Sequence, residues 1–358
     1  MSDTKNSATE KTVASKAQLP LQPTQEDTVV SYPPLLTVCS SPHIKNPDNT
    51  RSLMLDVIIA LLPALAWSVY AFGLRSLTLC AISVAMAVLS EFLYEKLLKK
   101  PVTVGDLSAV VTGLILSYNL PASVPFWIPA VGACFAIIVA KQLYGGIGKN
   151  IMNPALCARV FLTLAWPSQM ALFTAPTTDR LGAFSASLDA VASATPLQNL
   201  KAGILPNVSL QDMFLGNTGG CLGEVSALLL LAGGIYLLIR RVITWHTPVA
   251  FIGTVALLCF CFPRGNTDRF SFMLAQLLCG GLMLGAIYMA TDYATTPLNA
   301  RGRLLFGVGC GAITVLIRYF GTYPEGVSFA ILIMNTFVYY IEKATKPKRF
   351  GGRVHEKK

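Results

Sequence analysis

The segment DAVASATPL at residues 189–197 places a threonine hydroxyl where a reagent can reach it. Proline restricts the residue before it to extended geometry, so we expect Thr195 to stand clear of any helix with its hydroxyl accessible. Small neighbours leave room for a modifying enzyme or a bulky adduct, and Asp189, six residues earlier, is placed to bind a metal or to orient a donor. The residues alone also fit an ordinary exposed loop threonine.

Ionisable side chains in apolar surroundings are the other candidates for chemistry. They are Asp56, Asp106, Arg159 and Asp292, at or within apolar segments, and Glu91 and Glu95 near the end of one. Charges are costly in hydrocarbon and therefore indicate functional sites. Asp56 and Asp292 also fit solvated helix ends, which is the simpler interpretation of both. Arg159 lies deeper, and we expect it to pair with a carboxylate, a phosphate or backbone carbonyls.

The nine cysteines are scattered, mostly in apolar runs, without the spacing of a metal site. They are Cys39, Cys80, Cys134, Cys157, Cys221, Cys259, Cys261, Cys279 and Cys310. Small buried hydrophobic residues are the interpretation that this distribution favours. We predict no metal site, no iron–sulfur cluster and no disulfide framework from this chain alone.

The elements that position these residues lie in a chain that is 53% apolar and only 13% charged, against about 25% charged in soluble domains. This composition excludes an ordinary soluble enzyme and a disordered chain. Ten apolar segments have about the length that a bilayer requires: 53–73, 76–93, 103–120, 126–143, 151–166, 222–239, 248–262, 270–290, 304–320 and 327–341. We predict an all-α integral membrane protein with about ten transmembrane helices, several of them short or broken.

The basic residues alternate with these segments. If the N-terminal tail is cytoplasmic, 21 of the 28 Lys and Arg residues fall on the inner side, 6 on the outer side, and Arg159 within a span. The positive-inside rule then places both termini in the cytoplasm. Nucleic acid is excluded as a partner, because the net charge of +10 comes from loops between hydrophobic spans.

The same pattern divides the chain into five parts. Residues 1–34 are a polar, disordered cytoplasmic tail, and residues 342–358 a basic cytoplasmic tail. Residues 35–166 and 222–341 are membrane halves of five spans each, and 167–221 is the one long outer loop. An odd number of spans in each half allows a five-plus-five inverted repeat, as in many transporters.

The outer loop resembles the flavinylation motif of the RnfD/NqrB family. In that motif an aspartate lies six residues before an Ala-Thr whose threonine carries FMN through a phosphoester, and Asp189, Ala194 and Thr195 match it. Ala192 and Ser193 replace the usual Ser/Thr-Gly, which leaves Ser193 as a minor alternative acceptor. The resemblance thus implies covalent FMN on Thr195.

The resemblance extends over about residues 36–351 and is closer to RnfD than to NqrB, whose long N-terminal extension is missing. It includes SSPH at 40–43, MLDVIIALLP at 54–63, GGIGKNIMNPA at 145–155, ATDYATTP at 290–297 and YPEGVSFAIL at 323–332. It implies a subunit of the Rnf complex in the bacterial inner membrane. That complex relays electrons between ferredoxin and NAD and couples the transfer to Na+ or H+ translocation.

The family also implies the cofactors and the partners. A second flavin, riboflavin or another, is implied as a noncovalent ligand between the spans. The implied partners are the other Rnf subunits (A, B, C, E and G), a flavin transferase for maturation, and the lipid bilayer. Two alternatives stay open: an NqrB-like protein that reduces quinone, and a secondary transporter or channel without flavin.

The glycine-rich stretch before Asn150 does not match a phosphate-binding loop, because the first glycine of the Walker spacing is Leu143. It fits a loop that turns back into the membrane next to a short fifth span. There its amides, Asn150 or Asn153 are placed to contact a flavin or a neighbouring protein of the complex. Tight helix packing alone explains the glycines equally well.

Overall fold

The computed structural model describes residues 49–174, 196–206, 208–224, 226–265, 267–323 and 325–347. Over these residues the regular elements are helices, and an isolated antiparallel bridge joins Pro121 to Cys221. The prediction of an all-α protein is confirmed.

Each of the first five predicted segments overlaps a helix. They are α1 (Thr50–Phe72), α2 (Leu74–Leu97), α3 (Ser108–Tyr118), α4 (Trp127–Phe135) with its π-helical continuation η2 (Ala136–Gln142), and α5 (Pro154–Ala165). A short 3-10 turn, η1 (Val104–Asp106), precedes α3, and α6 (Pro167–Met170) follows α5. The short α7 (Pro196–Lys201) and α8 (Leu210–Leu215) come next.

The second five segments also contain helices. They are α9 (Ala227–Ile239), α10 (His246–Cys261), the run of α11 (Arg269–Leu278), α12 (Leu282–Leu284) and η4 (Gly285–Met289), then α13 (Ala300–Phe320) and α14 (Val327–Thr345). Ser226 is the N-cap of α9 and Asp268 is the N-cap of α11, because each side chain accepts a hydrogen bond from a backbone N–H of the first turn.

Four of these helices, α1, α2, α13 and α14, are long and apolar enough to cross a membrane. Arg269–Leu278 and Leu282–Met289 qualify as a fifth only when they are taken together, with a bend of 63° between them. The other apolar helices have 10–17 residues, fewer than the roughly 20 of an untilted span. Short and broken helices are therefore confirmed, and the number of ten spans stays a prediction.

The break between α11 and α12 is stabilised by an arginine that is distant in the sequence. Gly280 and Gly281 both have positive φ (74° and 63°), which favours glycine and ends α11. Arg318 of α13, almost fully buried, donates to the carbonyl oxygens of Gln276 (2.6 Å), Cys279 (2.9 Å) and Gly280 (3.1 Å). The guanidinium therefore satisfies backbone groups that a continuous helix would satisfy itself.

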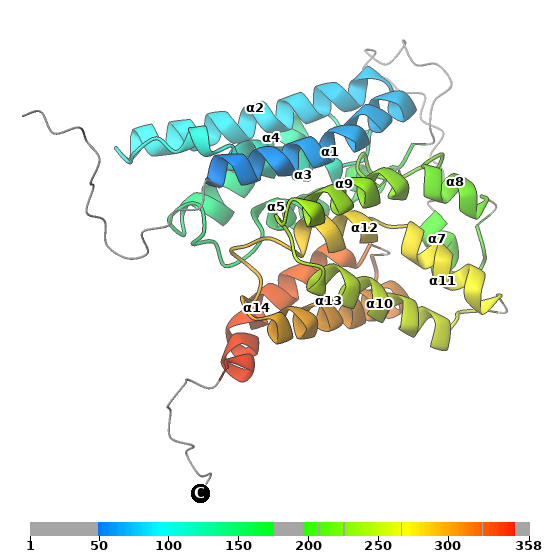
Figure 1. Cartoon of the computed structure of the whole chain (residues 1–358). Helices are drawn as coiled ribbons and strands as arrows, with labels where there is room; N and C mark the ends of the chain where they lie inside the picture. The colour runs from blue at the N-terminus through cyan, green and yellow to red at the C-terminus, as the bar shows by residue number, and fades with distance from the viewer. Residues whose placement is uncertain are drawn as a thin grey trace, which may run out of the picture. The chain divides into compact units, whose positions relative to one another are not determined.

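The two halves pack in corresponding ways. In the first half α2 packs against α3 and α4, and in the second α10 packs against α11 and α13. Figure 1 shows α1 to α4 in blue to blue-green at the top and α10, α13 and α14 at the bottom, with α5, α9 and α12 between them. Contacts of α1 with α9 and of α5 with α14 join the halves. This pairing is compatible with the five-plus-five repeat, which stays a prediction.

We expect Gly233 to be essential for the contact between α1 and α9. A methyl group there would lie 2.2 Å from Tyr288 Oη and 2.3 Å from the Ala60 carbonyl oxygen. Gly233→Ala should lower the free energy of unfolding by about 1–3 kcal/mol, measured by thermal unfolding of the detergent-purified protein. Gly253→Ala is the matched control, because no heavy atom lies within 4 Å of its added carbon. Equal melting temperatures for the two variants would contradict the predicted contact.

Candidate functional site

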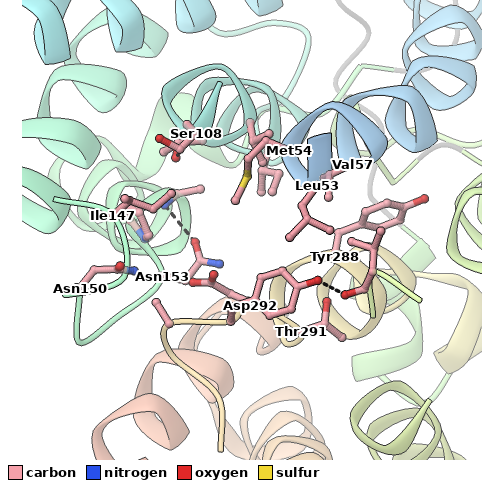
Figure 2. Close-up of a pocket in the computed structure, with 18 of the residues that line it drawn as sticks. Leu53, Met54, Val57, Ser108, Ile147, Asn150, Asn153, Tyr288, Thr291 and Asp292 are labelled. Carbon is pink, nitrogen blue, oxygen red and sulfur yellow. Dashed lines mark hydrogen bonds between the residues drawn. The ribbon is translucent and has the colours of Figure 1, made fainter. Parts of the chain in front are cut away.

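A cavity of about 420 Å³ lies where the first half meets the second. Its walls come from α1, α3, α5, α9, η4 and the loops around residues 147–150 and 291–294. Its size falls within the range of small-molecule sites, about 300–1,000 Å³. Figure 2 shows apolar side chains of α1, Leu53, Met54 and Val57, on one side, and Asn150, Asn153 and Asp292 across from them.

Asn153 holds one wall of the cavity in place. Its Oδ1 accepts from the backbone N–H groups of Ala155 (3.1 Å) and Leu156 (3.3 Å), and Pro154 occupies the first position of α5. Its Nδ2 donates to the Met289 carbonyl oxygen at 3.3 Å. The Asn153 side chain thus caps the N-terminus of α5 at the cavity and connects that helix to η4 by a hydrogen bond.

Asn150 and the glycine-rich loop complete the same wall. The Asn150 side chain is buried and donates to the Met152 carbonyl oxygen at 3.2 Å. Gly148, with φ of 79°, also lines the cavity. The loop before α5 therefore returns toward the helices, and both asparagines that sequence analysis selected lie at one cavity.

Asp292 belongs to this cavity as well, although its position in the sequence favoured a solvated helix end. Burial raises the pKa of its carboxyl, opposed by hydrogen bonds from the Ala294 N–H, the Thr295 hydroxyl and Asn150. Asp56 has a different environment: its carboxylate accepts from Tyr236 Oη (2.9 Å) and pairs with Arg240 (3.1 Å).

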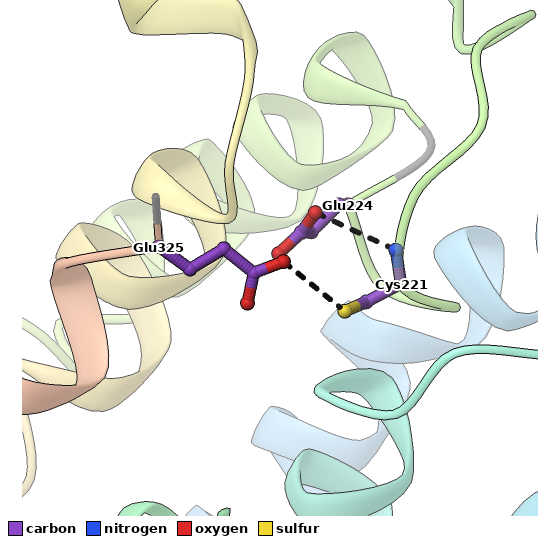
Figure 3. A group of neighbouring side chains, drawn as sticks. All are labelled: Cys221, Glu224 and Glu325. Carbon is purple, nitrogen blue, oxygen red and sulfur yellow. Dashed lines mark hydrogen bonds between the residues drawn. The ribbon is translucent and has the colours of Figure 1, made fainter. Parts of the chain in front are cut away.

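A second polar cluster surrounds Arg159, in the middle of α5. The Arg159 guanidinium pairs with Glu325, just before α14, and lies 3.6 Å from Cys221 Sγ. Cys221 Sγ is 3.9 Å from Glu325 Oε1, and the Cys221 N–H donates to Glu224 Oε2 at 3.5 Å. Figure 3 shows Glu325 and Glu224 converging on Cys221 from two sides.

The cluster shows the partner of Arg159 and brings together three residues that were not predicted as a site. Of the three partners expected for Arg159, the structure shows a carboxylate. The distribution of the cysteines favoured a small buried hydrophobic residue at Cys221, and neither glutamate was a candidate, yet ligand atoms of Cys221, Glu224 and Glu325 lie within 4.8 Å of one another. The signal that was present is the buried arginine, because a charge at this depth requires a counter-charge.

A smaller cavity of about 60 Å³ adjoins this cluster. Arg159, Gln198 and Glu325 line it with Tyr323 and Phe329, whose rings stack 5.9 Å apart. Arg159 Nη1 is buried and has no hydrogen-bond partner among the residues that the structure describes. Gln198 belongs to α7, which begins at Pro196, the residue after Thr195.

Comparison with known proteins decides the family. The model of the NQR2, RnfD, RnfE family matches residues 37–351. The chain belongs to this family. Membership in the NQR2, RnfD, RnfE family confirms the resemblance that the sequence motifs indicated.

Three relatives of this family member are named as D subunits of ion-translocating oxidoreductase complexes. The chain is 47% identical over 319 residues to the D subunit of the Na(+)-translocating ferredoxin:NAD(+) oxidoreductase complex of Acetobacterium woodii, covering 88% of this chain and 95% of the relative. It is 40% identical to the corresponding protein of the proton-translocating complex of Clostridium ljungdahlii (89% and 97% covered). It is 39% identical to that of the ion-translocating oxidoreductase complex of Stutzerimonas stutzeri (87% and 94%).

For this NQR2, RnfD, RnfE family member, the structure places three of the six predicted site residues. Asn150 and Asn153 meet at the larger cavity, and Arg159 lies at the smaller one. Asp189, Ser193 and Thr195 lie outside the described residues. The attachment of FMN to Thr195 therefore stays a prediction.

Proposed function

We propose that the chain is the RnfD component of a bacterial Rnf complex and carries two flavins, one covalent and one in the larger cavity. Relatives that match nearly their whole length are named as D subunits of ferredoxin:NAD(+) oxidoreductase complexes. The observation that carries the flavin assignment is the cavity of about 420 Å³ at Asn150 and Asn153. The other Rnf subunits (A, B, C, E and G) complete the proposed complex.

The residues of the larger cavity fit a flavin. A planar ring system with an apolar face and a polar edge needs an apolar wall and a few amide groups. Val57 and Ile115 offer the former, and the side-chain amides of Asn150 and Asn153 offer the latter. When bound, the flavin supplies the electron transfer, while these side chains orient it and keep water from it.

The smaller cavity supports a flavin on the outer loop. An FMN esterified to Thr195 is joined to the chain one residue before α7, whose Gln198 lines that cavity. Arg159 Nη1, a buried donor without a partner among the described residues, suits an anionic or carbonyl group of such a cofactor. Covalent attachment keeps the flavin from diffusing away, and a flavin transferase would install it with the help of Asp189.

Contacts of the basic residues on the outer side support the predicted orientation in the cell membrane, with both termini on the cytoplasmic side. Arg75 donates to the carbonyl oxygens of Ala122 (2.8 Å) and Val124 (3.0 Å), and Lys201 to that of Gly321 (2.6 Å). Arg318 binds carbonyls in the same way. These outer basic side chains form hydrogen bonds to backbone carbonyl oxygens. Among the basic residues without such bonds, the excess on the inner side is therefore still larger.

Counting flavins tests the proposal. Denaturation of the purified complex should release one flavin from the cavity and leave one FMN attached to this chain, as measured by chromatography and intact mass. Val57→Trp should remove at least about nine-tenths of the released flavin and none of the attached FMN, because the indole fills space that the ligand needs. Val131→Trp, on an exposed position of α4, is the control and should retain both flavins.

Each other outcome points to an alternative. A purified chain without any flavin would contradict the proposal and favour the secondary transporter or channel. A complex that keeps both flavins but reduces quinone in place of NAD would favour the NqrB-like alternative.

A further inference from the structure

A continuous row of polar side chains runs from the larger cavity to an exposed position. We call it the polar row; its members are Ser108, Lys141, Glu91, Gln142, Glu95 and Thr103. It begins at the cavity, which Ser108 and Lys141 line. Lys141 Nζ donates to Ser108 Oγ and to Glu91 Oε1, each at 2.6 Å.

The row continues through a shared amide. Gln142 Nε2 donates to Glu91 Oε1 at 2.8 Å and to Glu95 Oε1 at 3.2 Å. Glu95 accepts in turn from the backbone N–H of Thr103 at 2.9 Å and from the Thr103 hydroxyl. Thr103 is exposed at the turn before α3. Hydrogen bonds therefore link the cavity wall to the surface that the predicted orientation makes cytoplasmic.

The interior of the row is deeply buried and rich in negative charge. Glu91 is 0% exposed, Glu95 2% and Lys141 3%. The charged groups that face Glu91 are Lys141, Glu95 and Asp106, so a single ammonium group stands against three carboxylates. Glu91 Oε2 is buried and has no partner among the described residues. The row thus contains a buried carboxylate oxygen that can accept a hydrogen bond or a proton.

We propose that the polar row conducts protons from the inner aqueous surface to the cavity, and that Lys141 is the group that hands them to the cavity's ligand. The inference rests on the proposed function, in which that ligand is a flavin that receives electrons from other redox groups of the complex. For each proton transferred, an N–H bond of the Lys141 ammonium breaks and the ligand, which takes up one electron, gains the proton.

The return steps balance the transfer. Glu95 then passes a proton to the Glu91 carboxylate through a water molecule beside the Gln142 amide, and Glu91 passes it on to the neutral Lys141 amine. Glu95 is reprotonated from bulk water at Thr103. An ammonium group is suited to this task because it can give up a proton and become a neutral amine, whereas a guanidinium keeps its proton.

Proton uptake on reduction tests this path in the purified whole complex. Its flavins are reduced rapidly with dithionite while a pH-indicator dye reports proton uptake and absorbance reports the flavins. Lys141→Arg keeps the charge and the pairing with Glu91 but not the transferable proton. We expect both flavins to be present and the proton uptake linked to the cavity flavin to slow about a hundredfold, the contribution of a positioned proton donor.

A second variant guards against a folding defect, and a matched pair serves as control. Glu91→Gln with Lys141→Met removes both charges together, which avoids an unpaired buried ion, and should slow proton uptake equally. Asp56→Asn with Arg240→Gln removes a different ion pair, one that joins the two halves and lies off the row, and should leave the rate unchanged.

The outcomes separate the two proposals. Proton uptake at the wild-type rate in both variants, with the cavity flavin bound, would overturn the path while leaving the flavin assignment intact. A wild-type complex without a releasable flavin would overturn the proposed function, and the path would fall with it.

Discussion

Thr195→Ala is expected to abolish covalent flavin on this chain completely. The phosphoester requires a side-chain oxygen, and alanine has none, so no residual attachment is expected at this position. The measurement is flavin fluorescence of the chain after denaturing electrophoresis, together with the intact mass, which should fall by one FMN. Membrane insertion should be unaffected, because Thr195 lies in the long loop between the predicted fifth and sixth spans.

Three companion experiments make this result interpretable. Thr195→Ser should keep some flavin, because a serine hydroxyl can still accept the phosphoryl group, and Ser193→Ala tests the alternative acceptor. Asp189→Asn should lower the attached fraction if the carboxylate helps the transferase. A flavin transferase must be co-expressed throughout. Covalent FMN that persists when Thr195→Ala and Ser193→Ala are combined would show that the resemblance of the loop motif was misleading.

The positions of the helices could be predicted from the sequence because apolar content and length are local properties. The segment 304–320 contains most of α13 (Ala300–Phe320), and 327–341 most of α14. Boundaries that depend on one side chain were missed. The segment 151–166 contains α5, which begins only at Pro154, because Asn153 satisfies its first N–H groups.

One predicted span is broken in its interior, and the cause is a contact between residues far apart in the sequence. Residues 270–290 read as a single apolar segment, but the helix breaks at Gly280 and Gly281. The carbonyl groups released there are bound by Arg318, which lies 39 residues after Cys279 in the chain. Hydropathy does not record such a contact, because it depends on which helices become neighbours.

The candidate site was also predictable only in part. The glycine-rich loop indicated Asn150 and Asn153, because a loop that re-enters the protein brings its polar side chains with it. The partner of Arg159 was predictable only as a class. Glu325 lies 166 residues away in the sequence, and its proximity to Glu224 and Cys221 depends on the packing of α5 against α14 and on the segment before α9.

Arg159→Met is expected to lower the free energy of unfolding by about 3 kcal/mol, the low end for breaking a buried ion pair because Glu325 is partly exposed. The Arg159 side chain is 6% exposed and that of Glu325 20%. Without the guanidinium, the Glu325 carboxylate loses its partner, and Glu224 nearby loses a compensating charge. Thermal unfolding in detergent at fixed salt provides the measurement.

A double-mutant cycle separates the ion pair from lost packing. Arg159→Met with Glu325→Gln removes both charges, so we expect the double variant to be more stable than the sum of the single effects predicts. Arg240→Gln provides the contrast, because the Arg240 side chain is 52% exposed and exposed pairs contribute about 0–1 kcal/mol. If the two effects at Arg159 and Glu325 simply add, the pair contributes no coupling energy, and the contact between α5 and the start of α14 must be maintained by apolar packing alone.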